Sequence, residues 1–348
     1  MHEAFAALRL PAMFEVVVAP PGVPRTKPRA LNVALPLARG DFIAIYDAED
    51  VPHPDQLRLA VETFARVPFD VACLQGRLVI DNTEDSWITR FFTVEYATLF
   101  DVINPGLSRL NMPVPLGGTS NHFRRSVLQR LHGWDAWSVT EDADLGIRLA
   151  VAGYRIADLP SATLEEAPAT LAAWMKQRTR WMKGFMQVCV THSRKPVRTL
   201  RSLGAFRFFG AVTMTFGTVV AALGYPFFTA FSIKGLVDQT LFRAEAPFEV
   251  MSSVFGIILF VAGLVAIIVP ALVALGRRRW WGLLPYVPLL PFYYVLISVA
   301  AWRGFAELFF DPFRWNKTEH GLARTSRAGM LTHAEEAPGP HPPEVDRG

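Results

Sequence analysis

The stretch Gln177-Arg178-Thr179-Arg180-Trp181 lies at a boundary between two parts of the chain that differ sharply in composition. Short apolar runs alternate with helix-like patterns before it, and three long apolar runs follow it. Around it, in residues 171–189, Trp, Met and Phe side chains alternate with Lys and Arg. This pattern favours a helix in the membrane interface with its aromatic side in lipid. We therefore expect an α/β part, an interfacial segment and a membrane part, in that order.

Composition indicates the membrane part. Of the 348 residues, 51% are hydrophobic and only 19% are charged, which is an apolar balance for a soluble protein. No charged residue occurs in residues 208–233, 250–276 and 281–302. Each run has the roughly 20 residues that a helix needs to cross a bilayer. Three core helices of a soluble protein are the alternative, but the runs show little amphipathic alternation.

The basic residues predict a topology for these runs. Clustered Lys and Arg mark the cytoplasmic side of a span, and such clusters occur at 194–207 and at 277–279. The first two runs then form a hairpin with residues 234–249 outside. Three prolines interrupt the third run, which favours a broken, re-entrant or interfacial helix there. Because the positive charge gathers beside the membrane, the net charge of +4 indicates no nucleic acid partner.

Strands and helices are expected to alternate over residues 14–165. The predicted strands are short, apolar and β-rich, as in a buried parallel sheet; they are 14–19, 42–46, 71–75 and 154–159. The predicted helices are 29–37, 57–64, 87–102 and 142–152. Such alternation indicates an α/β fold with one core, in which ligands bind beyond the carboxyl ends of the strands.

An acidic cluster, Asp47-Ala48-Glu49-Asp50, directly follows one predicted strand. Asp47 and Glu49 could share a hard divalent ion, which would also hold a diphosphate. The alternative is a solvated turn that leads into Pro52 and Pro54.

A second acidic motif, Thr140-Glu141-Asp142, opens a predicted helix. One of its acids could act as a general base that accepts the proton of an attacking hydroxyl. The alternative is that these acids only stabilise the helix N-terminus.

The segment 177–181 offers groups for a phosphorylated sugar. Gln177 and Arg180 share one helix face, where a forked cation could hold a diphosphate. Trp181 presents a flat apolar surface on which a sugar ring can stack. The alternative, an anchor in the membrane interface, is compatible with this function. Upstream, the adjacent Gly117 and Gly118 allow close backbone approach to a ligand, but their spacing is not that of a P-loop.

In this order, the acidic cluster, Thr-Glu-Asp, Gln-x-x-Arg-Trp and the apolar runs resemble the membrane-embedded family-2 glycosyltransferases, which include bacterial cellulose, chitin and hyaluronan synthases. The resemblance implies a Rossmann-like glycosyltransferase type A catalytic domain, N-terminally incomplete, with interfacial helices and a C-terminal α-helical transmembrane region. The implied parts are the catalytic domain (1–165), the interfacial segment (166–204), the membrane region (205–310), a cytosolic loop (311–324) and a disordered tail (325–348).

The resemblance also implies roles for single residues. Asp47 and Glu49 match the pair that binds Mg²⁺ or Mn²⁺ with the donor diphosphate, and Asp142 matches the general base. The matches for donor binding are Lys27, Asn32, Gln177 and Arg180, and those for acceptor binding are Trp181, Glu141, Gly118 and Thr119.

The implied activity is that of an inverting, metal-dependent β-glycosyltransferase that moves a sugar from a UDP-sugar to a growing polysaccharide. The implied location is the bacterial inner membrane, in several passes, with the catalytic domain cytoplasmic and with additional membrane subunits as conceivable partners. The alternatives are single transfer to a lipid or short acceptor, and an inactive remnant that serves as a membrane partner. In the family, a further strand-helix-strand unit precedes the segment 14–19, so we expect this chain alone to bind nucleotide sugar poorly.

Overall fold

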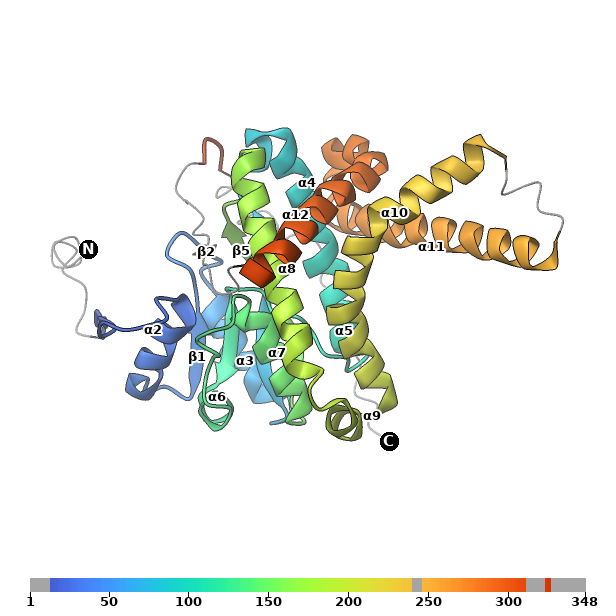
Figure 1. The fold of residues 1–348 in the computed structure, drawn as a ribbon. Coiled ribbons are helices and arrows are strands. Elements are labelled where there is room, and N and C mark those ends of the chain that lie inside the picture. The colour runs from blue at the N-terminus through green and yellow to red at the C-terminus, as the bar shows by residue number, and fades with distance from the viewer. Residues whose placement is uncertain (1–12, 240–245, 311–322, 327–348) are drawn as a thin grey trace, which may run out of the picture.

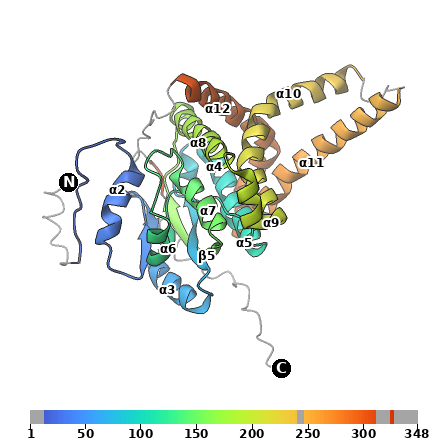
Figure 2. The same ribbon diagram turned by 60° about the horizontal axis from the view of Figure 1, so that its bottom comes forward.

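The computed structural model describes residues 13–239, 246–310 and 323–326. A body containing the sheet carries a long arm formed by α10 (Thr218–Val237) and α11 (Pro247–Arg278) (Figure 1). The second view shows the same two helices leaving the body together (Figure 2). The predicted α/β fold followed by a helical membrane region is confirmed.

The sheet has five strands in the order β1-β4-β3-β5-β2. These are β1 (Phe42–Ile45), β2 (Val51–Pro52), β3 (Val71–Ile80), β4 (Asn121–Arg124) and β5 (Arg155–Glu165). Among the described residues only β3 and β5 pair in parallel, whereas β4 runs antiparallel to both β1 and β3, and β2 runs antiparallel to β5. The expectation of a parallel sheet is therefore wrong in this respect. The reason is β4, whose polar sequence Asn-His-Phe-Arg has no strand pattern to reveal it.

The predicted strand 14–19 is not a strand. Its side chains lie largely in solvent, with Phe14 52% and Val18 66% exposed. Apolar, β-rich composition forms a strand only where a neighbouring strand supplies hydrogen bonds. Within the described residues, β1 is at the sheet edge and pairs only with β4.

The predicted helices of the catalytic part are confirmed with small changes in their bounds. They are α2 (Lys27–Ala34), α3 (Gln56–Arg66), α4 (Trp87–Thr98) and α7 (Glu141–Val151). Ser86 begins α4 with a capping box, because its hydroxyl accepts from the Thr89 amide while its own amide donates to the Thr89 hydroxyl. Beyond α4 the chain continues through a π-helical turn, Leu99–Ile103, into α5 (Asn104–Arg109), and α6 (Arg125–Arg130) follows β4.

The amphipathic segment forms α8 (Leu171–His192), but its aromatic side does not face outward to lipid. Trp174 is fully buried, and Met175, Met182 and Met186 lie in one core cluster with side chains of α4 and of α12 (Leu290–Phe310). The expectation for this side is wrong, because two other helices cover it. An apolar stripe on a helix looks the same in sequence whether protein or lipid covers it.

In the part of the chain that the structure describes, three helical segments are long and apolar enough to cross a membrane, namely Pro196–Val237, Pro247–Arg278 and Trp281–Phe310. The first begins with α9 (Pro196–Val212), where Gly204 has φ 74° and interrupts the helical backbone. The third begins as a 3₁₀ helix, Trp281–Leu289, over the predicted proline-rich stretch. Whether it spans stays a prediction. The expected cytosolic loop and tail lie outside the described residues, apart from 323–326.

Candidate active site

Lys27 joins the acidic cluster to the glycine loop. Asp47 follows the end of β1, and Lys27 is the first residue of α2. The Lys27 ammonium forms an ion pair with Asp47 and donates a 2.7 Å hydrogen bond to the carbonyl of Gly118. A β-carbon added to Gly118 would lie 3.4 Å from Oδ2 of Asp142. These contacts bring the acidic cluster, the glycine loop and the Thr-Glu-Asp motif together. They meet beyond the carboxyl end of β1, where the sequence predicts a ligand site.

Asp50, the last acid of the cluster, is a site residue that the sequence prediction did not include. One carboxylate oxygen accepts from the Thr119 hydroxyl and, at 3.0 Å, from the amide of Asp47. The other oxygen is buried and has no hydrogen-bond partner in the described structure. Burial raises the pKa of Asp50 to about 6, and the charges of Asp47 and Glu49 add to this. The cluster therefore concentrates more negative charge than Lys27 alone offsets.

Glu165 adds a further carboxylate that sequence analysis did not find. It ends β5, and burial raises its pKa well above the usual range, with contributions from Asp50, Asp47 and Glu49. One of its oxygens is buried without a hydrogen-bond partner among the described residues. The predicted strand ends at residue 159, whereas β5 continues to Glu165, so the carboxyl-end rule did not point to this acid.

The Thr-Glu-Asp motif begins α7 and faces α8. Thr140 makes no side-chain cap bond, and it packs against Gly184, where an added β-carbon would lie 2.4 Å from a Thr140 methyl carbon. Asp142 Oδ1 accepts a 2.7 Å hydrogen bond from the amide of Ala143 in the first turn. One oxygen of Asp142 thus serves the helix N-terminus, as in the alternative interpretation, while the other faces Gly118.

Burial raises the pKa values of both Glu141 and Asp142. The positive charges of Lys27 and Arg180 lower both pKa values in part, so all four groups lie within electrostatic reach of one another. Conversely, burial lowers the pKa of Arg180, while Glu141, Asp142 and Asp47 counteract it. Arg180 of α8 therefore lies within electrostatic reach of both acidic motifs.

The other predicted residues of α8 have different surroundings. Gln177 is 2% exposed, and its side-chain oxygen has no hydrogen-bond partner in the described part of the chain. Trp181 is half-buried against Phe92, with ring centroids 6.0 Å apart.

Asn32 binds the backbone of Trp134. Its amide nitrogen donates to the Trp134 carbonyl at 2.7 Å, and its oxygen accepts from the Trp134 amide at 2.9 Å. Both ends of the side chain hold a loop, so these contacts give its predicted role in donor binding no support.

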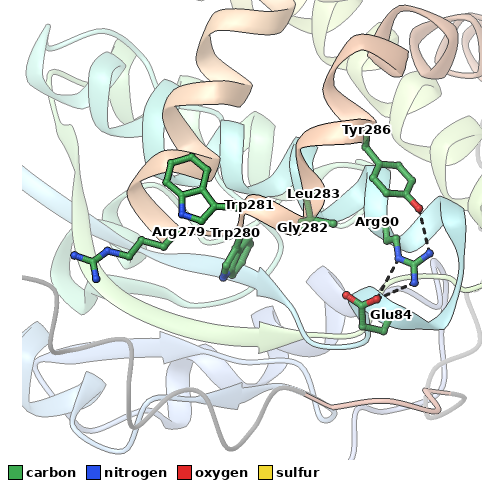
Figure 3. Close-up of a pocket in the computed structure, with 8 residues that line it drawn as sticks. All are labelled: Glu84, Arg90, Arg279, Trp280, Trp281, Gly282, Leu283 and Tyr286. Atoms are coloured by element: carbon green, nitrogen blue, oxygen red, sulfur yellow. Dashed lines mark hydrogen bonds and ion pairs between the residues drawn. The ribbon is translucent and has the colours of Figure 1, made fainter.

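A separate cavity of about 500 Å³ lies where α11 gives way to the 3₁₀ helix (Figure 3). Arg90 of α4 borders it, paired with Glu84 at 2.8 Å and donating to the Tyr286 hydroxyl at 3.1 Å. Trp280 and Trp281 line its other side. None of its lining residues belongs to the three motifs, so we place the candidate active site at the carboxylates.

Comparison with known proteins shows the family of the chain. A model of the glycosyl transferase family group 2 matches residues 42–306, so the chain belongs to this family. The "Probable glycosyltransferase YdaM" of Bacillus subtilis is 31% identical over 174 residues, which are 50% of this chain and 41% of that protein. The poly-β-1,6-N-acetyl-D-glucosamine synthase of Staphylococcus aureus is 28% identical over 178 residues, 51% of this chain and 43% of that protein.

Two further matches cover a smaller share of the relative or have a lower sequence identity. The "Probable glucomannan 4-beta-mannosyltransferase 1" of Arabidopsis thaliana is 30% identical over 41% of this chain and 26% of that protein. The chain thus spans less than half the length of these curated relatives. The mannosyltransferase PcManGT of Pyrobaculum calidifontis, solved with GDP-Man and Mn²⁺, aligns with a TM-score of 0.47 and 19% identity, over 83% of this chain and 68% of that chain.

Proposed function

We propose that this chain catalyses inverting transfer of a sugar from a UDP-sugar to a growing polysaccharide at the bacterial inner membrane, with its catalytic domain in the cytoplasm. The observation that supports this is the contact path from Asp47 through Lys27 and Gly118 to Asp142. It gathers, in one place, a carboxylate cluster suited to a diphosphate and a carboxylate suited to a base.

Asp142 is the general base of the proposed reaction. Its carboxylate takes the proton of an acceptor hydroxyl, whose oxygen forms a bond to the anomeric carbon of the donor. The bond from that carbon to the diphosphate breaks on the opposite side, and UDP leaves with the electron pair. A base whose pKa is raised by burial is better matched to this proton than an ordinary aspartate.

Cationic groups of the chain would stabilise the departing diphosphate. Arg180 faces the acidic motifs with a fork that fits phosphate oxygens, and Lys27 lies beside Asp47. Preorganised charge of this kind is usually the largest catalytic term.

Asp47 and Glu49 would hold a Mg²⁺ or Mn²⁺ ion. Within the described ranges, no group of three or more His, Cys, Asp or Glu side chains could hold a metal. This agrees with an ion that takes one or two carboxylates and completes its shell with substrate phosphates and water. The unsatisfied oxygen of Asp50 shows that the cluster has ligand capacity left. When bound, the ion would supply positive charge to the leaving group.

The acceptor would lie between Trp181 and the glycine loop. Trp181 provides a ring for stacking, Gly118 and Thr119 allow close backbone approach, and Glu141 adds a carboxyl group beside the base. Single transfer to a lipid or a short acceptor would use the same residues. The length of the product therefore distinguishes single transfer from polymer synthesis.

The test is turnover by the purified chain in nanodiscs with Mn²⁺ and with UDP-glucose, UDP-N-acetylglucosamine or GDP-mannose, each at concentrations high enough to allow for weak donor binding. The mannose donor is included because one relative is named as a mannosyltransferase. We expect a β-linked product from an α-linked donor, with activity lowered about 10²–10⁴-fold in Asp142→Asn. An α-linked product, or full activity of that variant, contradicts the proposal.

A further inference from the structure

Arg178 belongs to the 177–181 segment but faces away from the acidic motifs. It is two residues from Arg180, so the two side chains leave opposite sides of α8. Arg180 faces Glu141 and Asp142, whereas the contacts of Arg178 are with α4, with α12 and with rings of its own helix.

A buried ion pair holds the Arg178 guanidinium. Nη1 donates to Glu95 Oε1 at 2.7 Å, and Nη2 pairs with the other oxygen of the same carboxylate. The hydroxyl of Tyr293, on α12, donates to Glu95 Oε2 at 2.7 Å. The side chain of Arg178 is 8% exposed. A bidentate pair of this kind fixes both the position and the plane of the guanidinium.

The fixed cation lies against the ring of Trp181. The central guanidinium carbon is 4.7 Å from the centroid of the Trp181 ring, 4.8 Å from that of Phe92 and 5.5 Å from that of Trp174. Cation–π attraction at these distances is strongest when water is excluded. Trp181 itself is only half-buried.

We propose that Arg178 is a positioning residue for the glycan acceptor. Held by Glu95 and Tyr293, it fixes the ring of Trp181 against which the acceptor sugar stacks. Because Tyr293 belongs to α12, the same network ties the acceptor platform to the third apolar segment. This proposal rests on the proposed function, which gives Trp181 its role in acceptor binding.

The competing explanation is that the network only fastens α8 to its neighbours. A second buried ion pair provides a matched control for this. Lys183 of α8, whose side chain is fully buried, pairs with Glu307 of α12 at 3.1 Å. It ties α8 to α12, as Tyr293 of the network does, but Lys183 is two residues from Trp181 and therefore does not share its helix face.

The experiment compares Glu95→Gln, Arg178→Lys and Tyr293→Phe with the control Glu307→Gln in the full chain in nanodiscs. Tryptophan is replaced by 5-fluorotryptophan, and Trp181→Phe identifies the ¹⁹F resonance of Trp181. Kinetics are measured separately for the donor and for cellotetraose, chitotetraose and β-mannotetraose as acceptors.

We expect the three network variants to shift the Trp181 resonance and to raise the acceptor KM about tenfold, with the donor KM unchanged. Glu307→Gln should leave the resonance and the acceptor KM as in the wild type. An unchanged Trp181 resonance in the network variants overturns the proposal, as does an equal effect of Glu307→Gln. If the wild type transfers no sugar with any donor, the proposed function fails, while the resonance still decides whether Arg178 positions the ring.

Discussion

Gly118 faces Asp142 across the candidate site, with a β-carbon position on Gly118 only 3.4 Å from Oδ2 of Asp142. The carbonyl of the same glycine accepts from Lys27, which pairs with Asp47. A single backbone position therefore lies next to the proposed base and is tied to the proposed metal ligand. The chemistry assigned to each acid can be tested separately.

Replacing Asp142 by Asn should lower kcat about 10²–10⁴-fold, because the amide cannot accept the hydroxyl proton. Donor binding, measured by titration with UDP, should be retained. Asp144→Asn is the matched control, since Asp144 lies on the same helix but pairs with Arg148 and His192. We expect that control to lower the melting temperature while leaving kcat nearly unchanged. Equal loss of kcat in both variants would show that helix stability, and not the base, is at stake.

The pH dependence of transfer should show the raised pKa of Asp142. Only the ionised carboxylate accepts a proton, so activity is lost as the pH falls through the pKa of the folded protein. Burial raises that pKa, hence the acid limb of kcat/KM should lie above the range of an ordinary aspartate. A pH profile recorded between pH 4 and pH 9 measures this. If activity is lost only near the pKa of an ordinary aspartate, Asp142 is not the buried base that we propose.

Asp50 should make the metal-free protein less stable as the pH rises. Its pKa is raised from 3.8 to about 6, so the folded state binds its proton more tightly than the unfolded state does. Stability from this group is present at low pH and is lost between these two values. The full difference corresponds to about 3 kcal/mol, and partial exposure reduces it to about 1 kcal/mol. Urea unfolding at pH 4.5 and 7.5, compared with Asp50→Asn, should show a smaller pH effect in the variant.

Divalent metal with UDP should stabilise the chain through Asp47 and Glu49. At 100 times the dissociation constant, a ligand that binds only the folded state adds about 2.7 kcal/mol. Thermal unfolding should therefore shift upward with Mn²⁺ and UDP together, and the shift should disappear in Asp47→Asn. Glu62→Gln, which removes an acid from the exposed face of α3, is the control. A shift that survives in Asp47→Asn would place the ion elsewhere.

The sequence contained enough to predict which motifs share the site. The acidic cluster, Thr-Glu-Asp and Gln-x-x-Arg-Trp follow one another in the order on which the family resemblance rests. Ligands of α/β sheets bind beyond the carboxyl ends of the strands, which predicts Asp47 there, and the structure has Asp47 just after β1. Local patterns also predicted α3, α7 and α8 within a few residues. These features depend on short-range periodicity, which sequence reports directly.

The remaining features depend on contacts between distant residues. β4 has no apolar sequence pattern, and its residues form a strand because they pair with β1 and β3. The covered side of α8 required knowledge of α12, and the position of Glu165 required the pairing of β3 with β5. The sequence pattern identifies Arg178 only as a charged residue of an amphipathic helix, whereas the structure buries it in an ion pair with Glu95. Such partners cannot be read from one segment at a time.

The contact between α8 and α12 gives a final prediction, on stability. A β-carbon on Gly304 would lie 2.9 Å from the carbonyl oxygen of Thr179 and 3.1 Å from the amide nitrogen of Lys183. These are backbone atoms and cannot turn aside, so Gly304→Ala should separate the helices at a cost of about 1–3 kcal/mol. Gly263→Ala in α11 is the control, since its β-carbon meets nothing within 4 Å and alanine favours the helix. Thermal unfolding in nanodiscs should show a lower midpoint for Gly304→Ala only. Equal behaviour of the two variants would mean that α12 does not pack on α8 as described.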